Sequence, residues 1–275
     1  MAKQQYTYDY PRPAVTTDCV VFGIDGQNLK VLLIERGQEP YKGHWAFPGG
    51  FLNMDETAEQ CAVRELKEET GLDLYDLKQI GAFSAVDRDP RGRVITIAFY
   101  ALTRPSAVQG GDDAAEARWF ALNELPPLAF DHDSILREAR MKLRENLSKD
   151  RITSERINSL NRNEIFVFGS NLQGAHGGGA ARIALEKFGA IWGQGVGLQG
   201  QSYGIPTMQG GVETIKPYVD EFIAFAKHHP EMTFLVTRIG CGIAGFTSDE
   251  IAPLFAGAID VKNVHLPADF WEVLV

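Results

Sequence analysis

Apolar positions in the first half of the chain follow the two-residue period of β-strands, interrupted by helical segments. The run AVTTDCVVFGI at 14–24 and the run LKVLLIER at 29–36 predict two strands joined by the turn DGQN. A polar segment at 57–70 followed by Gly71 predicts a helix that ends at the glycine. Further strand-like segments lie at 79–87, 93–103 and 117–125. Strands mixed with few helices predict an α+β domain with a mixed sheet.

In the second half, apolar strand-like runs alternate with helical patterns. The predicted strands lie at 164–171, 202–208, 232–240 and 263–267, and the predicted helices at 177–189, 214–230 and 248–259. Pro217 is expected in the first helical turn, where proline is tolerated. This alternation is typical of a three-layer α/β domain.

A polar, charged stretch separates the two halves. Ile135, Ala139 and Leu143 recur at helical spacing within 134–147, which predicts an amphipathic helix that closes the first domain. The residues up to about Arg162 are predicted to form a linker. We therefore expect three parts, with boundaries at 1–147, 148–162 and 163–275.

Composition and charge narrow the class of protein. The 275 residues include 44% hydrophobic and 23% charged residues, as in folded globular proteins. The net charge of −9 lowers the expectation of nucleic-acid binding, which needs a basic face. Three widely spaced cysteines, no apolar run of membrane-spanning length and no apolar leader segment predict a cytoplasmic protein without a membrane partner.

The strongest chemical signal is a set of residues at fixed spacing around the helix predicted at 57–70. Glu65 lies three and four residues before Glu68 and Glu69, so one helical turn carries three carboxylates on one face. Hard carboxylate oxygens suit Mg²⁺ or Mn²⁺, and the backbone of Gly49 can also face such an ion. The acidic run alone is typical of an ordinary surface helix, so the interpretation depends on the whole pattern. The supporting positions are Gly50, Glu56, Arg64 and Gly71.

This spaced pattern resembles the signature of the Nudix hydrolases over residues 14–147. The flanking segments at 10–23, 43–53 and 87–96 are similar to those of the ADP-ribose pyrophosphatase branch and of the related transcriptional regulators of NAD metabolism. The resemblance implies an α+β Nudix fold with a mixed sheet between helices. It also implies a cofactor, Mg²⁺ or Mn²⁺, held by Glu65, Glu68 and Glu69, while Glu56 and Arg64 support the loop.

Other candidate residues surround this motif. Glu116 is a candidate general base or additional metal ligand. Phe47 and Tyr41 are candidates for stacking an adenine, although aromatic residues are more often part of a core. The hairpin segment at 87–93 offers guanidinium groups suited to phosphate and a carboxylate suited to ribose hydroxyls. Its candidates for substrate binding are Arg88, Asp89, Arg91 and Arg93.

Two glycine-rich loops in the second half form another candidate site. Each follows a predicted strand and precedes a predicted helix, where backbone N–H groups can bind anions. The arrangement resembles a macrodomain, a three-layer α/β module that binds ADP-ribose, although the connecting loops differ. The candidate ligand-loop residues are Asn171, Gly177, Gly178, Gly179, Gly240, Gly242 and Gly245.

These features predict a metal-dependent pyrophosphohydrolase acting on ADP-ribose or a related nucleoside diphosphate derivative. The alternatives are a non-catalytic sensor of ADP-ribose or an NAD-derived ligand, and an interaction protein with two inert domains. The resemblance further implies a homodimer through the Nudix part, with the aromatic segment at 6–13 as a candidate contact.

Overall fold

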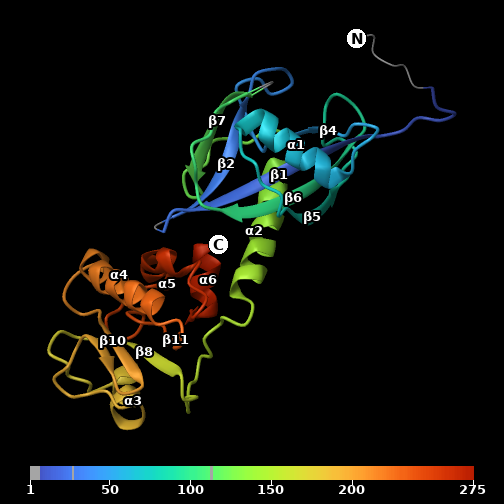
Figure 1. Ribbon diagram of the computed structural model, residues 1–275. Coiled ribbons are helices and arrows are strands. Elements are labelled where there is room, and N and C mark those ends of the chain that lie inside the picture. Colours follow the sequence, from blue (N-terminus) through green and yellow to red (C-terminus); the bar gives the residue numbers. More distant parts are fainter. Residues whose placement is uncertain (1–6, 27, 112–113) are drawn as a thin grey trace. The chain divides into compact units, whose positions relative to one another are not determined.

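Seven strands of the first half form one mixed sheet in the computed structural model of the chain (Figure 1). The structure describes residues 7–26, 28–111 and 114–275. The strands are β1 (Ala14–Ile24), β2 (Leu29–Arg36), β3 (Trp45–Ala46), β4 (Gly49–Phe51), β5 (Lys78–Phe83), β6 (Val94–Thr103) and β7 (Ala114–Ala121). Their order is β3-β2-β1-β6-β5, with β4 paired to β1 and β7 paired to β2. Among the strand pairs whose register is described, β1 and β6 are parallel and the others are antiparallel, which confirms the mixed sheet.

Helix α1 (Ala58–Thr70) carries the acidic motif and has a cap at each end. Thr57 accepts a hydrogen bond from the Gln60 backbone, while the Gln60 side chain accepts one from the Thr57 backbone. This reciprocal capping box satisfies two N–H groups that the first turn leaves unpaired. Gly71 adopts a left-handed conformation (φ 75°) and ends the helix. The predicted helix and its glycine stop are therefore confirmed.

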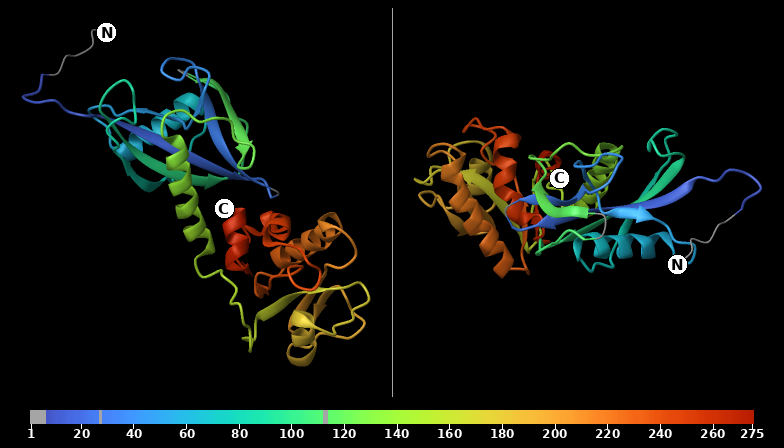
Figure 2. Two further views of the ribbon diagram at one scale, coloured as in Figure 1. Left: turned by 180° about the vertical axis from the view of Figure 1, so that it is seen from behind. Right: turned by 90° about the horizontal axis from the view of Figure 1, so that it is seen from above.

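Helix α2 (His132–Ser148) follows the sheet along the chain. Its residues Ile135, Ala139 and Leu143 are fully or almost fully buried, which confirms the predicted apolar face. Seen from the front and from behind, α1 and α2 lie on opposite faces of the seven-stranded sheet (Figures 1 and 2).

The second half contains a five-stranded sheet in the order β12-β11-β8-β10-β9. Its strands are β8 (Glu164–Ser170), β9 (Gly197–Gln199), β10 (Ser202–Pro206), β11 (Thr233–Val236) and β12 (Val264–His265). The short strand β9 is antiparallel to β10, and the other pairs are parallel. A second mixed sheet is therefore present, and its likeness to a macrodomain stays a prediction.

The helices of the second half begin and end elsewhere than the pattern predicts. They are α3 (Gly179–Lys187), α4 (Val212–His228), α5 (Ser248–Ile251), the 3₁₀ segment η1 (Ala252–Ala258) and α6 (Ala268–Leu274). Because α4 begins at Val212, Pro217 lies in its second turn, and the expectation of a first-turn position was wrong. The single helix expected at 248–259 is interrupted near Pro253, which cannot donate a backbone hydrogen bond.

The chain divides into two units at a point inside α2. One unit holds Met1–Gly23 and Lys30–Lys142, and the other holds Ile24–Leu29 and Leu143–Val275. The segment expected as a linker at 148–162 belongs to the second unit, where Arg151 and Thr153 are buried. The start of the segment is not a free linker, because Arg151 anchors it to the second unit. The Arg151 side chain donates hydrogen bonds to the backbone carbonyl groups of five residues: Leu147, Ala258, Ile259, Val261 and Val264.

Across the described residues, the structure contains no helix with the length and apolar character needed to cross a membrane.

Candidate active site

A polar cavity of about 310 Å³ lies in the first unit, next to α1. Strands β1, β2 and β4, helix α1, the segment 88–91 and the start of α2 all contribute to its wall. Its charged and histidine lining residues are Asp18, Arg36, Glu39, Arg64, Glu65, Glu69, Arg88, Asp89, Arg91 and His132. The cavity therefore combines carboxylates with guanidinium groups.

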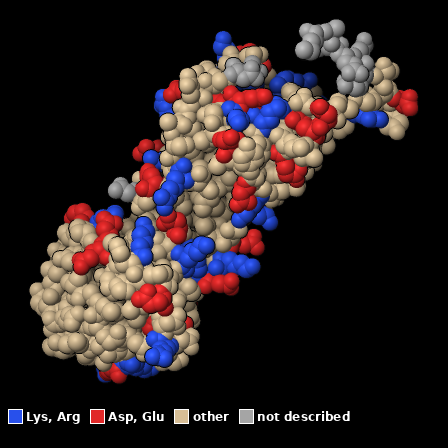
Figure 3. Space-filling view, in the orientation of Figure 1, with Lys and Arg blue, Asp and Glu red and all other residues tan. Residues whose placement is uncertain are grey.

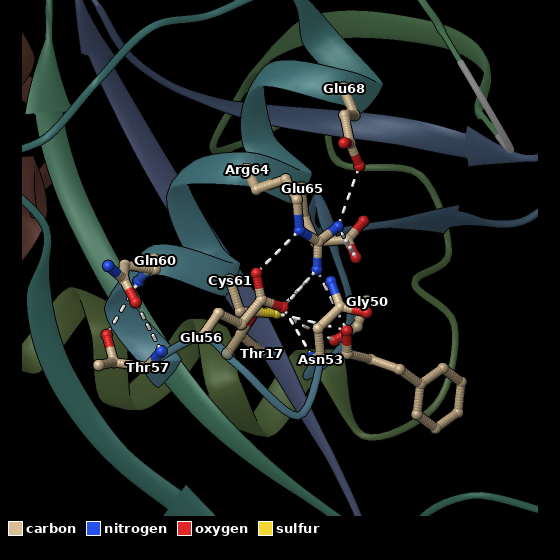
Figure 4. Close-up of polar contacts among 11 residues, drawn as sticks. Thr17, Gly50, Asn53, Glu56, Thr57, Gln60, Cys61, Arg64, Glu65 and Glu68 are labelled. Atoms are coloured by element: carbon tan, nitrogen blue, oxygen red, sulfur yellow. Dashed lines mark hydrogen bonds and ion pairs between the residues drawn. The ribbon is translucent and has the colours of Figure 1, made fainter. Parts of the chain in front are cut away.

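Arg64 links the loop after β4 to the acidic face of α1 (Figure 4). Its Nη2 and Nε donate to the two carboxylate oxygens of Glu56 at 2.6 and 3.0 Å, and Nη2 also reaches the carbonyl of Phe51. The bidentate contact lowers the pKa of Glu56 to about 2. Glu56 also accepts a hydrogen bond from the Asn53 backbone at 2.7 Å. The structure brings the two predicted supporting residues together as an ion pair that holds this loop against the helix.

The same guanidinium group contacts two of the three clustered carboxylates. Its Nη1 donates to Glu65 at 2.7 Å and to Glu68 at 3.0 Å. Glu65 is half-buried, and burial raises its pKa. The Glu68 carboxylate is more exposed and lies outside the lining of the cavity.

Glu69 is the buried carboxylate of the cluster. Only 6% of the residue is exposed, and its Oε2 accepts a hydrogen bond from the backbone of Gly49 at 2.8 Å. Burial raises the pKa of Glu69 to about 8, because the charged form loses its hydration. A buried carboxylate beside Glu65 is stabilised by a proton or a cation.

These donors fit a hard divalent cation in chemical type, since Glu65 and Glu69 both line the cavity beside the Gly49 backbone. Within the described part of the chain, however, no three His, Cys, Asp or Glu side chains converge closely enough to hold an ion as they stand. Arg64 donates to both Glu65 and Glu68 and so provides the positive charge shared by that pair. A bound cation would take over part of this role.

The structure does not bring the candidate base Glu116 into this site. Glu116 lies on β7, where it pairs across the strands with Glu35 and forms an ion pair with Arg118 at 2.7 Å. Its side chain is partly exposed and is not part of the cavity wall. The neighbouring acidic positions Asp112 and Asp113 lie outside the described residues.

The predicted substrate-binding residues of the 87–93 hairpin have different positions. Arg88 lines the cavity but is buried, and it donates two hydrogen bonds to Asp131 at 2.7 and 3.0 Å. Asp89 is buried and holds the guanidinium group of Arg91 in a bidentate contact, so its carboxylate is already engaged. Arg91 lines the cavity with much of its side chain exposed. Arg93 instead donates to the Ala85 carbonyl and is not among the lining residues.

The candidate stacking residues Phe47 and Tyr41 both pack against other rings of the first unit, and Phe47 also lines the cavity. Phe47 is 2% exposed, and its ring stacks on His132 with centroids 4.9 Å apart and an interplanar angle of 9°. Tyr41 packs its ring against the ring of Phe130.

Several residues of the cavity wall were not predicted from the sequence, among them Asp18, Arg36, Glu39, Phe51, Phe130 and His132. Asp18 is a charged residue inside an apolar strand, which is a usable signal. Phe130 and His132 lie at or just before the start of the amphipathic helix α2, and nothing local marks them as part of a distant cavity.

His132 is a buried, neutral partner of two other segments. Its Nδ1 accepts a hydrogen bond from the Phe47 backbone at 3.0 Å, so the neutral ring carries its proton on Nε2. That nitrogen lies 3.5 Å from Oδ1 of Asp18. Burial lowers the pKa of His132, which favours this neutral form. Asp18 is also 3.6 Å from Arg88, so two fixed neighbours orient its carboxylate.

In the second unit, the two glycine-rich loops follow adjacent parallel strands, β8 and β11. The loops approach each other closely, because a Cβ placed on Gly178 would lie 3.4 Å from Cδ1 of Ile243. The side chain of Asn171 bonds to both backbone groups of Ala175, so it closes its own loop. Gly177 and Gly179 adjoin the start of α3, and Gly240, Gly242 and Gly245 lie in the loop after β11.

Comparisons with known proteins agree with the geometry of the first unit. The NUDIX domain matches residues 12–139. An ADP-ribose pyrophosphatase of Methanocaldococcus jannaschii is 47% identical over 129 residues, which cover 47% of this chain and 74% of that protein. The ADPR responsive transcriptional repressor NtrR of Acinetobacter baylyi is 38% identical over 140 residues. These residues cover 49% of this chain and 56% of the repressor.

A solved structure is also similar to this part of the chain. A MutT/nudix family protein from Enterococcus faecalis is 33% identical, with a TM-score of 0.50, over 53% of this chain and 67% of that one. Each of these matches covers about half of the chain. The matched domain and the 47% identical pyrophosphatase show that the chain belongs to the Nudix hydrolase family.

Proposed function

We propose that the first unit hydrolyses ADP-ribose to AMP and ribose 5-phosphate with the help of Mg²⁺ or Mn²⁺. The observation that carries the proposal is one cavity in which the carboxylates of Glu65 and Glu69 and the guanidinium groups of Arg36 and Arg91 all form part of the wall. Such a cavity suits a divalent cation together with the diphosphate group that it neutralises. The 47% identity to an ADP-ribose pyrophosphatase supports this choice of substrate among nucleoside diphosphate derivatives.

The residues of the cavity have different roles in the proposed reaction. Glu65 and Glu69 would hold the cation with the Gly49 backbone, while exposed Glu68 stands beside them. The cation, when bound, supplies charge neutralisation and an activated water molecule. Asp89 holds the guanidinium group of Arg91 in place at the cavity wall.

The test measures AMP by chromatography after incubation with ADP-ribose and Mg²⁺. We expect Glu69→Gln to lower turnover by roughly 10³ or more, because the variant loses the charge that stabilises the transition state. The matched control is Glu59→Gln, which removes an exposed carboxylate from the first turn of the same helix. Wild-type protein that produces no AMP, or that keeps its turnover in EDTA, would contradict the proposal.

A second candidate function is a sensor that binds ADP-ribose without cleaving it. The 38% identity to an ADPR responsive repressor favours it. On the face drawn in Figure 3, basic and acidic side chains are interspersed, with no continuous basic stripe. Calorimetric binding of ADP-ribose by wild-type protein without release of AMP would identify the sensor.

We also propose that the second unit binds an ADP-ribose-type ligand at its two glycine-rich loops. Both loops lie at the carboxyl ends of β8 and β11, where the strand order reverses direction, and open parallel sheets usually bind ligands at such a point. In full-length Glu69→Gln protein, calorimetry should detect two binding sites, and adding Gly242→Glu should remove one through repulsion. Lys187→Glu at the far end of α3 is the control.

Finally, we propose that the first unit forms a homodimer with a second copy of the chain. An open groove runs beside residues 8–15 and 51–56, and Tyr10 and Met54 are highly exposed there. Tyr6, at the start of the predicted contact segment, lies outside the described residues. Sedimentation should give about twice the 30.4 kDa mass of the chain.

A further inference from the structure

Four side chains on the cavity wall alternate between guanidinium and phenyl groups. The guanidinium carbon of Arg36 lies 4.8 Å from the ring centroid of Phe130. That of Arg91 lies 5.6 Å from the same ring and 5.2 Å from the ring of Phe51. We call Arg36, Phe130, Arg91 and Phe51 the cation–aromatic ladder, and all four line the cavity that holds Glu65 and Glu69.

The backbone holds Phe130 in an unfavourable conformation. Its φ of 54° lies in the left-handed region, which bulky residues rarely adopt. Ala129 before it donates to the Trp45 carbonyl at 2.8 Å, and Asp131 after it holds Arg88. The ring also meets Tyr41, with centroids 4.7 Å apart. Strain that the surroundings enforce at a cavity is typical of residues that orient a side chain for binding.

The two guanidinium groups are also fixed. Nε of Arg36 donates to the Pro40 carbonyl at 2.8 Å. Asp89 accepts hydrogen bonds from the side chain and the backbone N–H of Arg91. Planar cations and phenyl rings that are held in place offer flat surfaces to a heterocyclic base, and a base stacks well on both kinds of surface.

We propose that the cation–aromatic ladder binds the nucleobase of the substrate by stacking, and that Phe51 and Phe130 determine the preference for substrates that carry a base. This inference rests on the proposed hydrolysis of ADP-ribose and adds the means of recognition. Ribose phosphate without a base has no flat ring to stack, so it would gain nothing from the phenyl groups.

The experiment compares the two products as inhibitors, because AMP carries a base and ribose 5-phosphate does not. In Phe51→Leu and Phe130→Leu, we expect the inhibition constant of AMP to rise roughly fivefold to 150-fold. The inhibition constant of ribose 5-phosphate should change less than about twofold. The matched control is Phe120→Leu, since the Phe120 ring also contacts a guanidinium group, 5.7 Å away on Arg118, but lies outside the cavity lining.

Each outcome decides the proposal. Equal weakening of both products would show that the ladder binds phosphate, and unchanged AMP inhibition in Phe51→Leu would show that the rings only support the cavity. If Phe130→Leu fails to fold, the exposed Phe51 decides alone. If the wild-type protein does not cleave ADP-ribose, calorimetry with AMP still tests the ladder, because weaker binding by Phe51→Leu supports it. Absence of AMP binding by the wild type overturns it.

Discussion

At the scale of single residues, His132 makes the stability of the folded chain depend on pH. Burial lowers its pKa below the usual 6.5, although Asp18 and Asp131 oppose this effect and Arg88 and Arg36 add to it. At a pH below 6.5, the unfolded chain therefore binds more protons at this residue than the folded chain does. The free energy of unfolding should decrease as the pH falls below 6.5, by up to about 1.4 kcal/mol per pH unit from this residue.

The variant His132→Asn isolates this contribution, because its amide oxygen can still accept the hydrogen bond from Phe47. Urea unfolding between pH 8 and pH 5 should show a smaller slope for the variant than for the wild type. The control His228→Asn, at an exposed helix end, should keep the wild-type slope. Identical slopes for all three proteins would mean that folding does not lower the pKa of His132.

Single residues also mark how far the sequence predicts this site. The pairing of Glu56 with Arg64 is local, eight residues apart on one loop and helix, so the spacing identifies it. The position of the Arg88 side chain depends on Asp131, which is 43 residues away, and no local sequence pattern predicts that contact. An arginine predicted to bind substrate is therefore buried in an internal ion pair. The cavity residues Asp18 and His132 were missed for the same reason, because their contacts arise only when distant strands and helices meet.

At the scale of elements, two glycines at the ends of the acidic motif have different roles. A Cβ on Gly50 would overlap the carboxylate of Glu65, whereas a Cβ on Gly71 would meet nothing within 4 Å. Gly71 instead has φ 75°, a conformation that costs other residues about 1 kcal/mol or more. One glycine therefore protects the geometry of the site, and the other protects the helix end.

We expect Gly50→Ala to lower turnover at least tenfold, through displacement of Glu65, as misplaced catalytic groups commonly do. Gly71→Ala should lower the free energy of unfolding by about 1 kcal/mol with little loss of turnover. Chemical unfolding and AMP release, measured on the same preparations, separate the two effects. Equal turnover in both variants would show that Glu65 adapts to the added methyl group.

Elements with strong local signals were predicted well. Helix α1 has a capping box at Thr57 and a glycine stop, and both signals lie within or next to the helix. The helix expected at 248–259 fails because apolar periodicity does not register the missing donor of Pro253. Periodicity thus predicts that an element exists more securely than it predicts where the element ends.

At the scale of the whole molecule, the structure places the acidic motif and the glycine-rich loops in separate units, each with its own sheet. The segment 148–162 was expected to be a linker because it is polar, and polarity alone does not reveal burial. Arg151 is about 9% exposed, and its guanidinium group lies 4.8 Å from the Trp271 ring centroid. Its hydrogen bonds go to carbonyl groups around the end of η1. The start of this segment therefore packs into the second unit through Ser148, Arg151 and Thr153, whereas most of its other residues are exposed.

Replacing Arg151 should therefore destabilise the second unit and leave the first unit's chemistry unchanged. Arg151→Leu leaves several buried carbonyl groups unpaired, which should cost roughly 3 kcal/mol or more. Calorimetry of the full chain should show a thermal transition lowered by several degrees.

ADP-ribose turnover at 25 °C should stay within about twofold of the wild type, because all lining residues of the catalytic cavity lie between Thr16 and His132. Lys149→Leu, which changes an exposed residue of the same segment, should leave both quantities unchanged. Loss of turnover together with the transition would mean that the two units fold as one.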